Sequence, residues 1–317
     1  MTRGRRKQSL AALATERANP TTRNLDLESS LEIARIINAQ DAKVAVAVKR
    51  ALPAIARAID WIAEALRAGG RLIYVGTGSS GRIAAMDAAE CPPTFNTDPA
   101  KVQFVMAGGT KALGAAVEAN EDSVLLGRRE MAKKRPGKHD VVVAIAASGR
   151  TPFTLAALQY ARRLGATTVA LTCNRASALS RAAHLAIVTE VGPEVISGSS
   201  RMKAGTAQKM VLNMLSTGAM TRLGAVYGNL MVNVHLKNSK LRARGVGILR
   251  KAAGVPEATA RKALRSAGNS VPVALIMLKA GVRKSEAARA LQSANGCVRE
   301  AIAVANSGRA GASRRIR

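Results

Sequence analysis

Two apolar patterns alternate along most of the chain. Short runs of consecutive Val, Ile and Leu predict strands at residues 71–76, 102–107, 139–146, 166–172 and 185–189. Around these runs, apolar residues at helical spacing predict helices at residues 25–38, 41–68, 79–90, 111–119, 121–134, 153–164 and 205–223. Apolar strands that alternate with helices are typical of a parallel sheet covered on both faces. The pattern therefore predicts an α/β fold.

The pattern changes after residue 238. Short helical segments joined by Gly, Pro and Asn turns are predicted at residues 239–253, 256–265, 270–280 and 284–293, with no further strand. We therefore expect a basic N-terminal arm at 1–26, a sheet domain with leading helices at 27–237, a small helical bundle at 238–306 and a basic tail at 307–317.

The stretch from Arg71 to Pro93, RLIYVGTGSSGRIAAMDAAECPP, combines a strand, a glycine- and serine-rich turn and a helix that leads to Glu90. Glycines let a backbone approach a ligand closely, hydroxyl groups donate hydrogen bonds, and a helix N-terminus favours an anion. This order predicts a phosphate-binding turn with Ser79 and Ser80 at its centre. A second turn of the same kind, Ser148-Gly149-Arg150, follows the strand at 139–146. In open parallel sheets, ligands bind at the carboxyl ends of the strands, where both turns are expected to lie.

The first turn also matches the dinucleotide-binding pattern GxGxxG, through Gly76, Gly78 and Gly81. That pattern requires an acidic residue at the end of the second strand, where it holds a ribose. Here the second strand runs into Ala107-Gly108-Gly109 without an acid. The two serines also suit a terminal phosphate better than a pyrophosphate, so a nicotinamide or flavin site is disfavoured.

Composition and charge limit the compartment and the classes of partner that we expect. The chain has 317 residues, three widely spaced cysteines and a formal net charge of +29. The cysteines match no metal or disulfide pattern, and no apolar run reaches the length of a membrane span, which favours a cytoplasmic protein without a membrane partner. The basic residues are spread over the whole chain and accompany no nucleic-acid-binding motif, so we expect solvated basic faces and no specific nucleic-acid partner.

Four ordered stretches carry a family resemblance: TERANP at 15–20, the turn and helix at 76–93, VVAIAASGRTP at 142–152, and GPEVISGSSRMKAGT at 192–206. With these motifs the chain resembles the N-acetylmuramic acid 6-phosphate etherases, which are built on a sugar isomerase (SIS) domain and are related to the glucokinase regulatory proteins. The resemblance covers about residues 15–305. It implies a three-layer, flavodoxin-like parallel-sheet SIS domain with N-terminal helices and a small C-terminal helical bundle.

The resemblance also implies an activity. Such enzymes cleave the D-lactyl ether of N-acetylmuramic acid 6-phosphate to N-acetylglucosamine 6-phosphate and D-lactate during recycling of cell-wall amino sugars, as cytoplasmic homodimers without metal or organic cofactor. Their general acid corresponds to Glu90 and their second catalytic carboxylate to Glu121. The phosphate-contacting positions of related proteins correspond to Ser79, Ser80, Ser148 and Gly149, with Arg150 beside them.

The chemistry needs one acid and one base in different protonation states. We expect Glu90 near the C-terminus of its helix, where the helix dipole favours a protonated acid. We expect Asn120 to cap the next helix, which would put Glu121 in the first turn and favour the anion. Glu118 and Asp122 are neighbouring candidates for the base.

Two alternative functions remain, and the chain departs from the family pattern in two places. A sugar-phosphate isomerase needs a base but leaves Glu90 without a role, and a sugar-phosphate-sensing regulatory protein needs no catalysis. The presence of both carboxylates favours the etherase, and lactate release separates it from both alternatives. Asn233 stands where many family members carry an acid, and the basic tails have no counterpart in the family.

Overall fold

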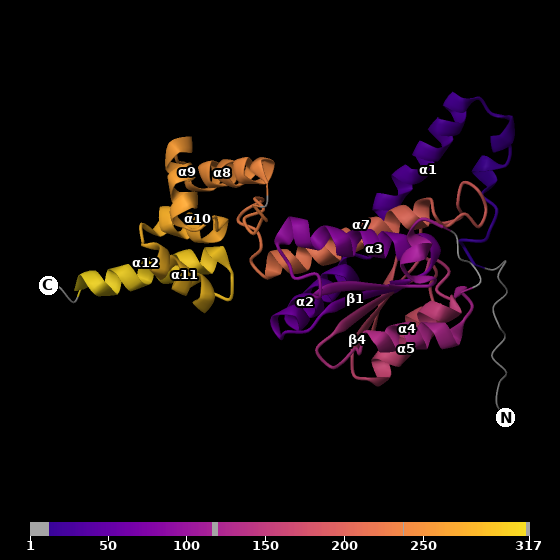
Figure 1. The fold of residues 1–317 in the computed structure, drawn as a ribbon. Coiled ribbons are helices and arrows are strands. Elements are labelled where there is room, and N and C mark those ends of the chain that lie inside the picture. Colours follow the sequence, from indigo (N-terminus) through magenta and orange to yellow (C-terminus); the bar gives the residue numbers. More distant parts are fainter. Residues whose placement is uncertain (1–12, 116–119, 237, 315–317) are drawn as a thin grey trace. The chain divides into compact units, whose positions relative to one another are not determined.

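The computed structural model describes residues 13–115, 120–236 and 238–314 (Figure 1). It contains two compact units, one made of residues up to 88 together with 100–216, and one made of residues 89–99 together with those from 217 onward. Each unit has its own hydrophobic core. The basic segments at 1–12 and 315–317, and Glu118, lie outside the described residues.

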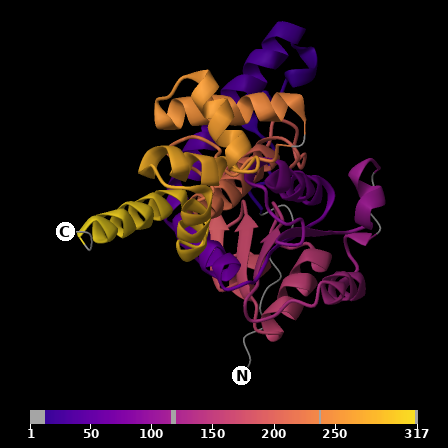
Figure 2. The ribbon, with the colours of Figure 1, turned by 60° about the vertical axis from the view of Figure 1, so that its left-hand side comes forward.

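A five-stranded parallel sheet forms the centre of the first unit, with its strands side by side and pointing the same way (Figure 2). The strands are β1 Leu72–Gly76, β2 Val102–Met106, β3 Val141–Ile145, β4 Thr167–Thr172 and β5 Leu185–Val188. Their order, β2-β1-β3-β4-β5, is that of flavodoxin-like sheets. The predicted α/β fold and all five predicted strands are confirmed. Because β1 and β3 are neighbours, the two glycine turns follow adjacent strands.

Helices cover both faces of this sheet and give three layers (Figure 1). The helices up to residue 222 are α1 Ser30–Arg50, α2 Leu52–Arg67, α3 Gly78–Phe95, α4 Val124–Lys133, α5 Pro152–Arg163, α6 Ala178–Ala182 and α7 Lys203–Arg222. Apolar side chains of α4, α5 and α6 pack with Ile73, Val142 and Ala170 on one face. On the other face, Tyr74 of β1 reaches α3. The short helix α6 was not predicted.

Several helix boundaries differ from the prediction. Helix α1 runs without a break through residues 38–41 and ends at Arg50, because Pro53 takes the first turn of α2. Where a helix was predicted at 111–119, the described residues form a 3-10 helix at Gly109–Leu113. Helix α3 continues five residues beyond the predicted end at 90, to Phe95.

The second unit is helical in its described part. Its C-terminal helices are α8 Ser239–Ala253, α9 Glu257–Ser266, α10 Val271–Ala280, α11 Lys284–Ser293 and α12 Val298–Arg314. The first four match the predicted segments, and α12 was not predicted. Their shared core includes the fully buried residues Leu249, Ala274 and Ala287. Neither unit contains, in its described residues, a helix that is long and apolar enough to cross a membrane.

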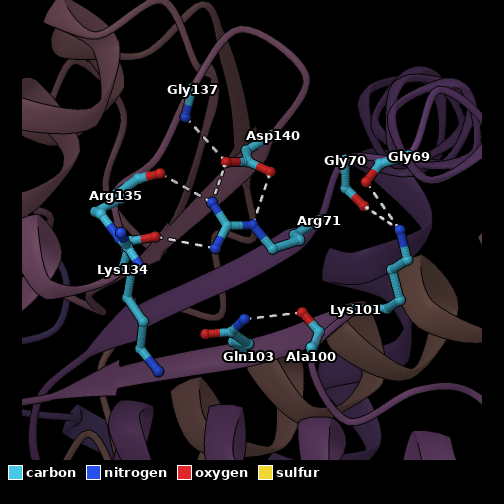
Figure 3. Close-up of polar contacts among 10 residues, drawn as sticks. All are labelled: Gly69, Gly70, Arg71, Ala100, Lys101, Gln103, Lys134, Arg135, Gly137 and Asp140. Atoms are coloured by element: carbon cyan, nitrogen blue, oxygen red, sulfur yellow. Dashed lines mark hydrogen bonds and ion pairs between the residues drawn. The ribbon is translucent and has the colours of Figure 1, made fainter.

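A buried ion pair joins the amino ends of β1 and β3 (Figure 3). The Arg71 guanidinium donates from Nε and Nη2 to the two carboxylate oxygens of Asp140, at 3.1 and 2.6 Å, and the Gly137 N–H donates to the same carboxylate at 2.9 Å. Burial alone would raise the pKa of Asp140, but the hydrogen bonds from Arg71 and Gly137 outweigh burial and lower it. Arg71 also donates to the carbonyl oxygens of Lys134 and Arg135, which ties the loop after α4 to the sheet.

Replacing Asp140 with Asn should lower the free energy of unfolding by about 1–3 kcal/mol at neutral pH, because the charged hydrogen bonds of Arg71 are lost. A carboxyl group with a lowered folded-state pKa stabilises above its unfolded-state pKa, and the stabilisation disappears as the pH falls through the folded-state pKa. Urea unfolding of the wild type and of Asp140→Asn gives the free energy of unfolding at each pH. Between neutral and strongly acidic pH, the two free energies should converge as the pH falls. In the control Glu190→Gln, which breaks an exposed pair with Arg175, the change should stay within about 0.5 kcal/mol. A constant difference at all pH values would contradict the assignment to Asp140.

Candidate active site

The turn between β1 and α3 depends on two missing side chains. A Cβ on Gly76 would lie 3.0 Å from the backbone nitrogen of Gly81, and a Cβ on Gly81 would lie 2.7 Å from Cγ of Met106. Glycine at both positions lets the helix start directly against the ends of β1 and β2. The ladder of α3 starts where the Gly81 N–H donates to the Thr77 carbonyl at 3.0 Å. The preceding N–H groups, including those of Ser79 and Ser80, have no acceptor within the helix, which is the usual setting for an anion.

Glu121 lies at this turn. Its Oε1 is 3.1 Å from the position that a Cβ on Gly78 would occupy, and Gly78 has a φ of +50°. The Glu121 carbonyl accepts the N–H of Phe153 at 3.0 Å, which fixes its backbone to the first turn of α5. The structure therefore brings half-buried Glu121 together with Ser79 and Ser80. The predicted reason was wrong, however: Ser123 caps α4 by accepting the Leu126 N–H, so Glu121 precedes the helix instead of occupying its first turn.

The second turn follows β3 and is tightly closed. The Ser148 Oγ accepts the Arg150 N–H at 3.3 Å, and Gly149 has a φ of +66°. A Cβ on Gly149 would overlap the Ser177 side chain and lie 2.7 Å from Oγ1 of Thr172. Among the described residues, the buried Nη1 of Arg150 has no hydrogen-bond partner. This turn therefore places Ser148, Gly149 and a buried guanidinium donor next to the strand that carries the first turn.

Gln208 of α7 was not predicted as a site residue from the sequence. Its Oε1 accepts the Ser80 hydroxyl at 2.9 Å, and the residue is only 1% exposed. The neighbouring positions on the same helix face, Ala204, Val211 and Leu215, are also buried. A single amide on the apolar face of a predicted helix was the available signal.

Glu90 is not at this turn. It lies on α3, 12 residues beyond Gly78, which corresponds to about 18 Å of rise along the helix. Its side chain is exposed. Because α3 continues to Phe95, Glu90 does not occupy the last turn, where the helix dipole acts. The helix-terminus argument for keeping Glu90 and Glu121 in different protonation states therefore fails at both residues.

A buried carboxylate, also missed from the sequence, holds α3 in place. Asp87 is 4% exposed and accepts hydrogen bonds from the Tyr74 hydroxyl at 2.8 Å, the Asn213 amide at 2.8 Å and the Ser216 hydroxyl at 3.1 Å. The network joins β1, α3 and α7. It fixes the direction in which α3 leaves the turn, and Asp87 acts as a structural residue.

The other motif stretches build a second buried polar cluster. Glu194 accepts the N–H groups of Lys203 and Ala204 at the start of α7, and the Lys203 ammonium donates to Oε1 of Gln40 at 3.0 Å. Asn19 donates to the same Gln40 oxygen at 3.2 Å. Burial raises the pKa of Glu194 and lowers that of Lys203. Lys203 is 1% exposed, and its ammonium is held inside this cluster by Gln40 of α1, which also accepts the Asn19 amide.

Asn233 has a structural contact of its own. Its Nδ2 donates to the carbonyl of Phe95, the last residue of α3, at 2.8 Å. An ionised acid at this position has no proton to donate. Asn233 therefore supplies a donor for the Phe95 carbonyl that an ionised acid at this position would lack.

No group of three or more His, Cys, Asp or Glu side chains in the described part of the chain could hold a metal ion. Burial raises the pKa of the Cys173 thiol to about 12, which disfavours the thiolate form that a nucleophile needs. What the site offers is helix N–H groups, hydroxyls, a guanidinium and a half-buried carboxylate. Such a set can bind a phosphate and move a proton.

Comparison with known proteins identifies relatives. The model of the glucokinase regulatory protein N-terminal SIS domain matches residues 54–162, and that of the SIS domain matches residues 129–218. The N-acetylmuramic acid 6-phosphate etherase of Symbiobacterium thermophilum is 57% identical over 270 residues, which cover 85% of this chain and 89% of the relative. N-acetylmuramic acid 6-phosphate etherase 1 of Bacillus licheniformis is 48% identical over the same shares.

Two solved structures are similar to part of this chain. A phosphoheptose isomerase from Francisella tularensis is 21% identical, with a TM-score of 0.47 over 61% of this chain and all of that one. The Vibrio vulnificus NanR protein complexed with ManNAc-6P is 15% identical, with a TM-score of 0.44 over 62% of this chain and 65% of that one.

Replacing Gly149 with Ala should lower the free energy of unfolding by at least about 3 kcal/mol, because a left-handed backbone and a steric overlap are both penalised. Gly192→Ala is the matched control: its φ is +72° and nothing lies within 4 Å of its Cβ position. In the control, the free energy of unfolding should fall by only about 1–2 kcal/mol, which is the cost of a left-handed backbone conformation for a residue with a Cβ. Denaturant unfolding measures both. Equal decreases in the free energy of unfolding of the two variants would mean that the close packing around Gly149 does not contribute to stability.

Proposed function

Because this chain belongs to the family of N-acetylmuramic acid 6-phosphate etherases, we propose that it is a carbon–oxygen lyase that hydrolytically removes D-lactate from N-acetylmuramic acid 6-phosphate. The products are N-acetylglucosamine 6-phosphate and D-lactate, and the role is recycling of cell-wall amino sugars. The observation that carries the proposal is 47–57% identity, over 85% of this chain, to relatives with that name.

The two glycine turns bind the phosphate of the substrate. The helix N-terminus at Ser79 and Ser80 supplies N–H groups, and the turn after β3 supplies Ser148, Gly149 and the guanidinium of Arg150. Positive partial charge at a helix start and a buried cation both favour a dianion. Anchoring the phosphate fixes C2 and C3 of the sugar relative to the catalytic carboxylates.

Glu121 is the base. Opening of the sugar ring turns C1 into an aldehyde, which makes the C2 proton acidic. The Glu121 carboxylate, held beside Gly78 by its backbone bond to Phe153, removes that proton. The electron pair forms a C2–C3 double bond and expels the lactyl oxygen from C3.

Glu90 is the acid and protonates the departing lactyl oxygen, so lactate leaves with a hydroxyl group. The ionised Glu90 then takes a proton from a water molecule as its oxygen bonds to C3, and Glu121 returns its proton to C2. Each carboxyl group ends in its starting state, and the overall reaction consumes one water molecule. One acid and one base of this kind contribute about 10²–10⁴-fold each.

We further propose that the protein works as a cytoplasmic homodimer. Along α3, Glu90 lies about 18 Å from the turn at which Glu121 lies. That separation favours a site in which the base of one subunit is served by Glu90 of the partner subunit. A two-fold symmetric dimer would then contain two such shared sites.

The two alternative functions make different demands. An isomerase uses a base but releases nothing from C3, and a sugar-phosphate sensor only binds. The identity to relatives named etherases does not favour either alternative. Release of D-lactate is the measurement that separates the three.

Wild-type protein should release D-lactate from N-acetylmuramic acid 6-phosphate in a coupled enzymatic assay, and Glu90→Gln should reduce the rate at least about 100-fold. In deuterated water, Glu90→Gln should still exchange the C2 proton, whereas Glu121→Gln should not, because only the base is needed for exchange. Glu257→Gln, an exposed carboxylate on α9, is the control and should match wild type. Normal exchange in Glu121→Gln would move the base to another residue, and absence of lactate from folded wild-type protein would favour the sensor.

Mixing the Glu90→Gln and Glu121→Gln subunits tests the shared site. Random pairing makes about half of the dimers mixed, and each mixed dimer has one site with both carboxylates intact, so about a quarter of the wild-type activity should return. Co-expression with two affinity tags isolates the mixed dimers for assay. Isolated mixed dimers without activity would show that both carboxylates must come from one subunit, and a monomer in solution would exclude the proposal.

A further inference from the structure

We propose that Gln208 binds the substrate phosphate, through its Nε2, and that Ser80 serves to position it. The ligand class in this inference rests on the proposed function. The residue itself follows from hydrogen-bond geometry at the start of α3.

Gln208 is buried and only half satisfied. It is 1% exposed, its Oε1 accepts the Ser80 hydroxyl at 2.9 Å, and its buried Nε2 has no hydrogen-bond partner among the described residues. Buried polar groups in folded proteins are nearly always paired, and each exception requires an explanation. An acceptor oxygen that arrives with a ligand would satisfy this nitrogen.

The donor balance at Ser80 indicates which atom of the pair suits an anion. A serine hydroxyl has one proton, and Ser80 gives it to Gln208. The Ser80 oxygen then has only lone pairs to offer, which a phosphate oxygen repels. The amide Nε2 carries two protons and no acceptor capacity, so it is the donor that suits a phosphate. Ser80 contributes its backbone N–H in the first turn of α3 and holds the Gln208 oxygen away from the ligand.

The position of Gln208 agrees with this role. Its partner Ser80 lies in the first turn of α3, where N–H groups without helical acceptors favour an anion over a neutral group. Arg150 of the neighbouring turn also carries a buried donor nitrogen, Nη1, that has no partner in the part of the chain that the structure describes. Two unpaired buried donors thus belong to residues at the two turns that follow adjacent strands, β1 and β3.

Calorimetric titration with N-acetylglucosamine 6-phosphate, and separately with inorganic phosphate, tests the proposal. Gln208→Met removes the donor without adding charge and should weaken both ligands about 10-fold. Gln208→Glu keeps the acceptor for Ser80 but places an anion at Nε2, and should weaken both about 100-fold. Ser80→Ala should lose less affinity for both ligands than Gln208→Met does, because Nε2 of Gln208 and the backbone N–H at position 80 both remain.

Gln103→Glu is the matched control for the change from amide to carboxylate. Gln103 lies near the amino end of β2, where its Nε2 donates to the Ala100 carbonyl at 2.8 Å (Figure 3). It should bind both ligands as wild type does. Thermal unfolding of every variant shows whether it is folded before titration, and Gln208→Met provides the answer if a buried carboxylate prevents Gln208→Glu from folding.

Three results would overturn the proposal: Gln208→Met binding within twofold of wild type, loss of sugar phosphate binding with unchanged affinity for inorganic phosphate, or a larger loss in Ser80→Ala than in Gln208→Met. The proposed function fails separately. If wild type binds the sugar phosphate with the expected dependence on Gln208 but releases no lactate, this inference stands and the etherase activity does not. If wild type releases lactate and Gln208→Met binds normally, only this inference fails.

Discussion

The missing Cβ atoms of Gly76 and Gly81 are the constraint on which the rest of the site depends. They let α3 start against the carboxyl ends of β1 and β2, at distances shorter than those at which Cβ atoms ordinarily pack. The N–H groups of the first turn of α3 are thereby held at the carboxyl end of the sheet, beside the glycine turn that follows the neighbouring strand β3. The anion binding that we propose for this site depends on this close approach and needs no unusual residue.

The direction of α3 is then fixed by polar contacts in the core. Asp87 accepts hydrogen bonds from Tyr74 of β1 and from Asn213 and Ser216 of α7. Hydrogen bonds to a buried charged group contribute about 1.5–3 kcal/mol each and are directional. They hold α3 between the sheet and α7, and the same two helices meet again where Ser80 contacts Gln208. The turn and the buried carboxylate therefore act together.

The strands and the two turns were predictable because each depends on local signals: continuous Val and Ile runs, and glycine beside hydroxyl residues. The helix ends near the carboxylates were not. Asn120 and Ser123 are both good capping residues, and the sequence does not show that Ser123 is used. Helix α3 ends at Phe95, five residues beyond the predicted end, and is followed by Asn96, whose φ of +56° is the left-handed conformation that commonly terminates helices. Gln208 was missed because its importance lies in contacts between distant segments.

The residues of the family motifs fall into two groups in the structure: some lie at the candidate site, and others hold the fold together. Glu121 and Ser80 lie at the turn, but Asn19, Glu194 and Lys203 lie in a buried polar cluster that fastens the N-terminal segment and caps α7. Breaking one partner of such a cluster leaves a buried group unpaired, at a cost comparable to losing a site contact. Recognition of this family from sequence thus rests partly on residues that hold α7, and with it Gln208, in place. The same physical requirement, pairing of buried polar groups, explains these structural residues and draws attention to Nε2 of Gln208 and Nη1 of Arg150, which have no partner among the described residues.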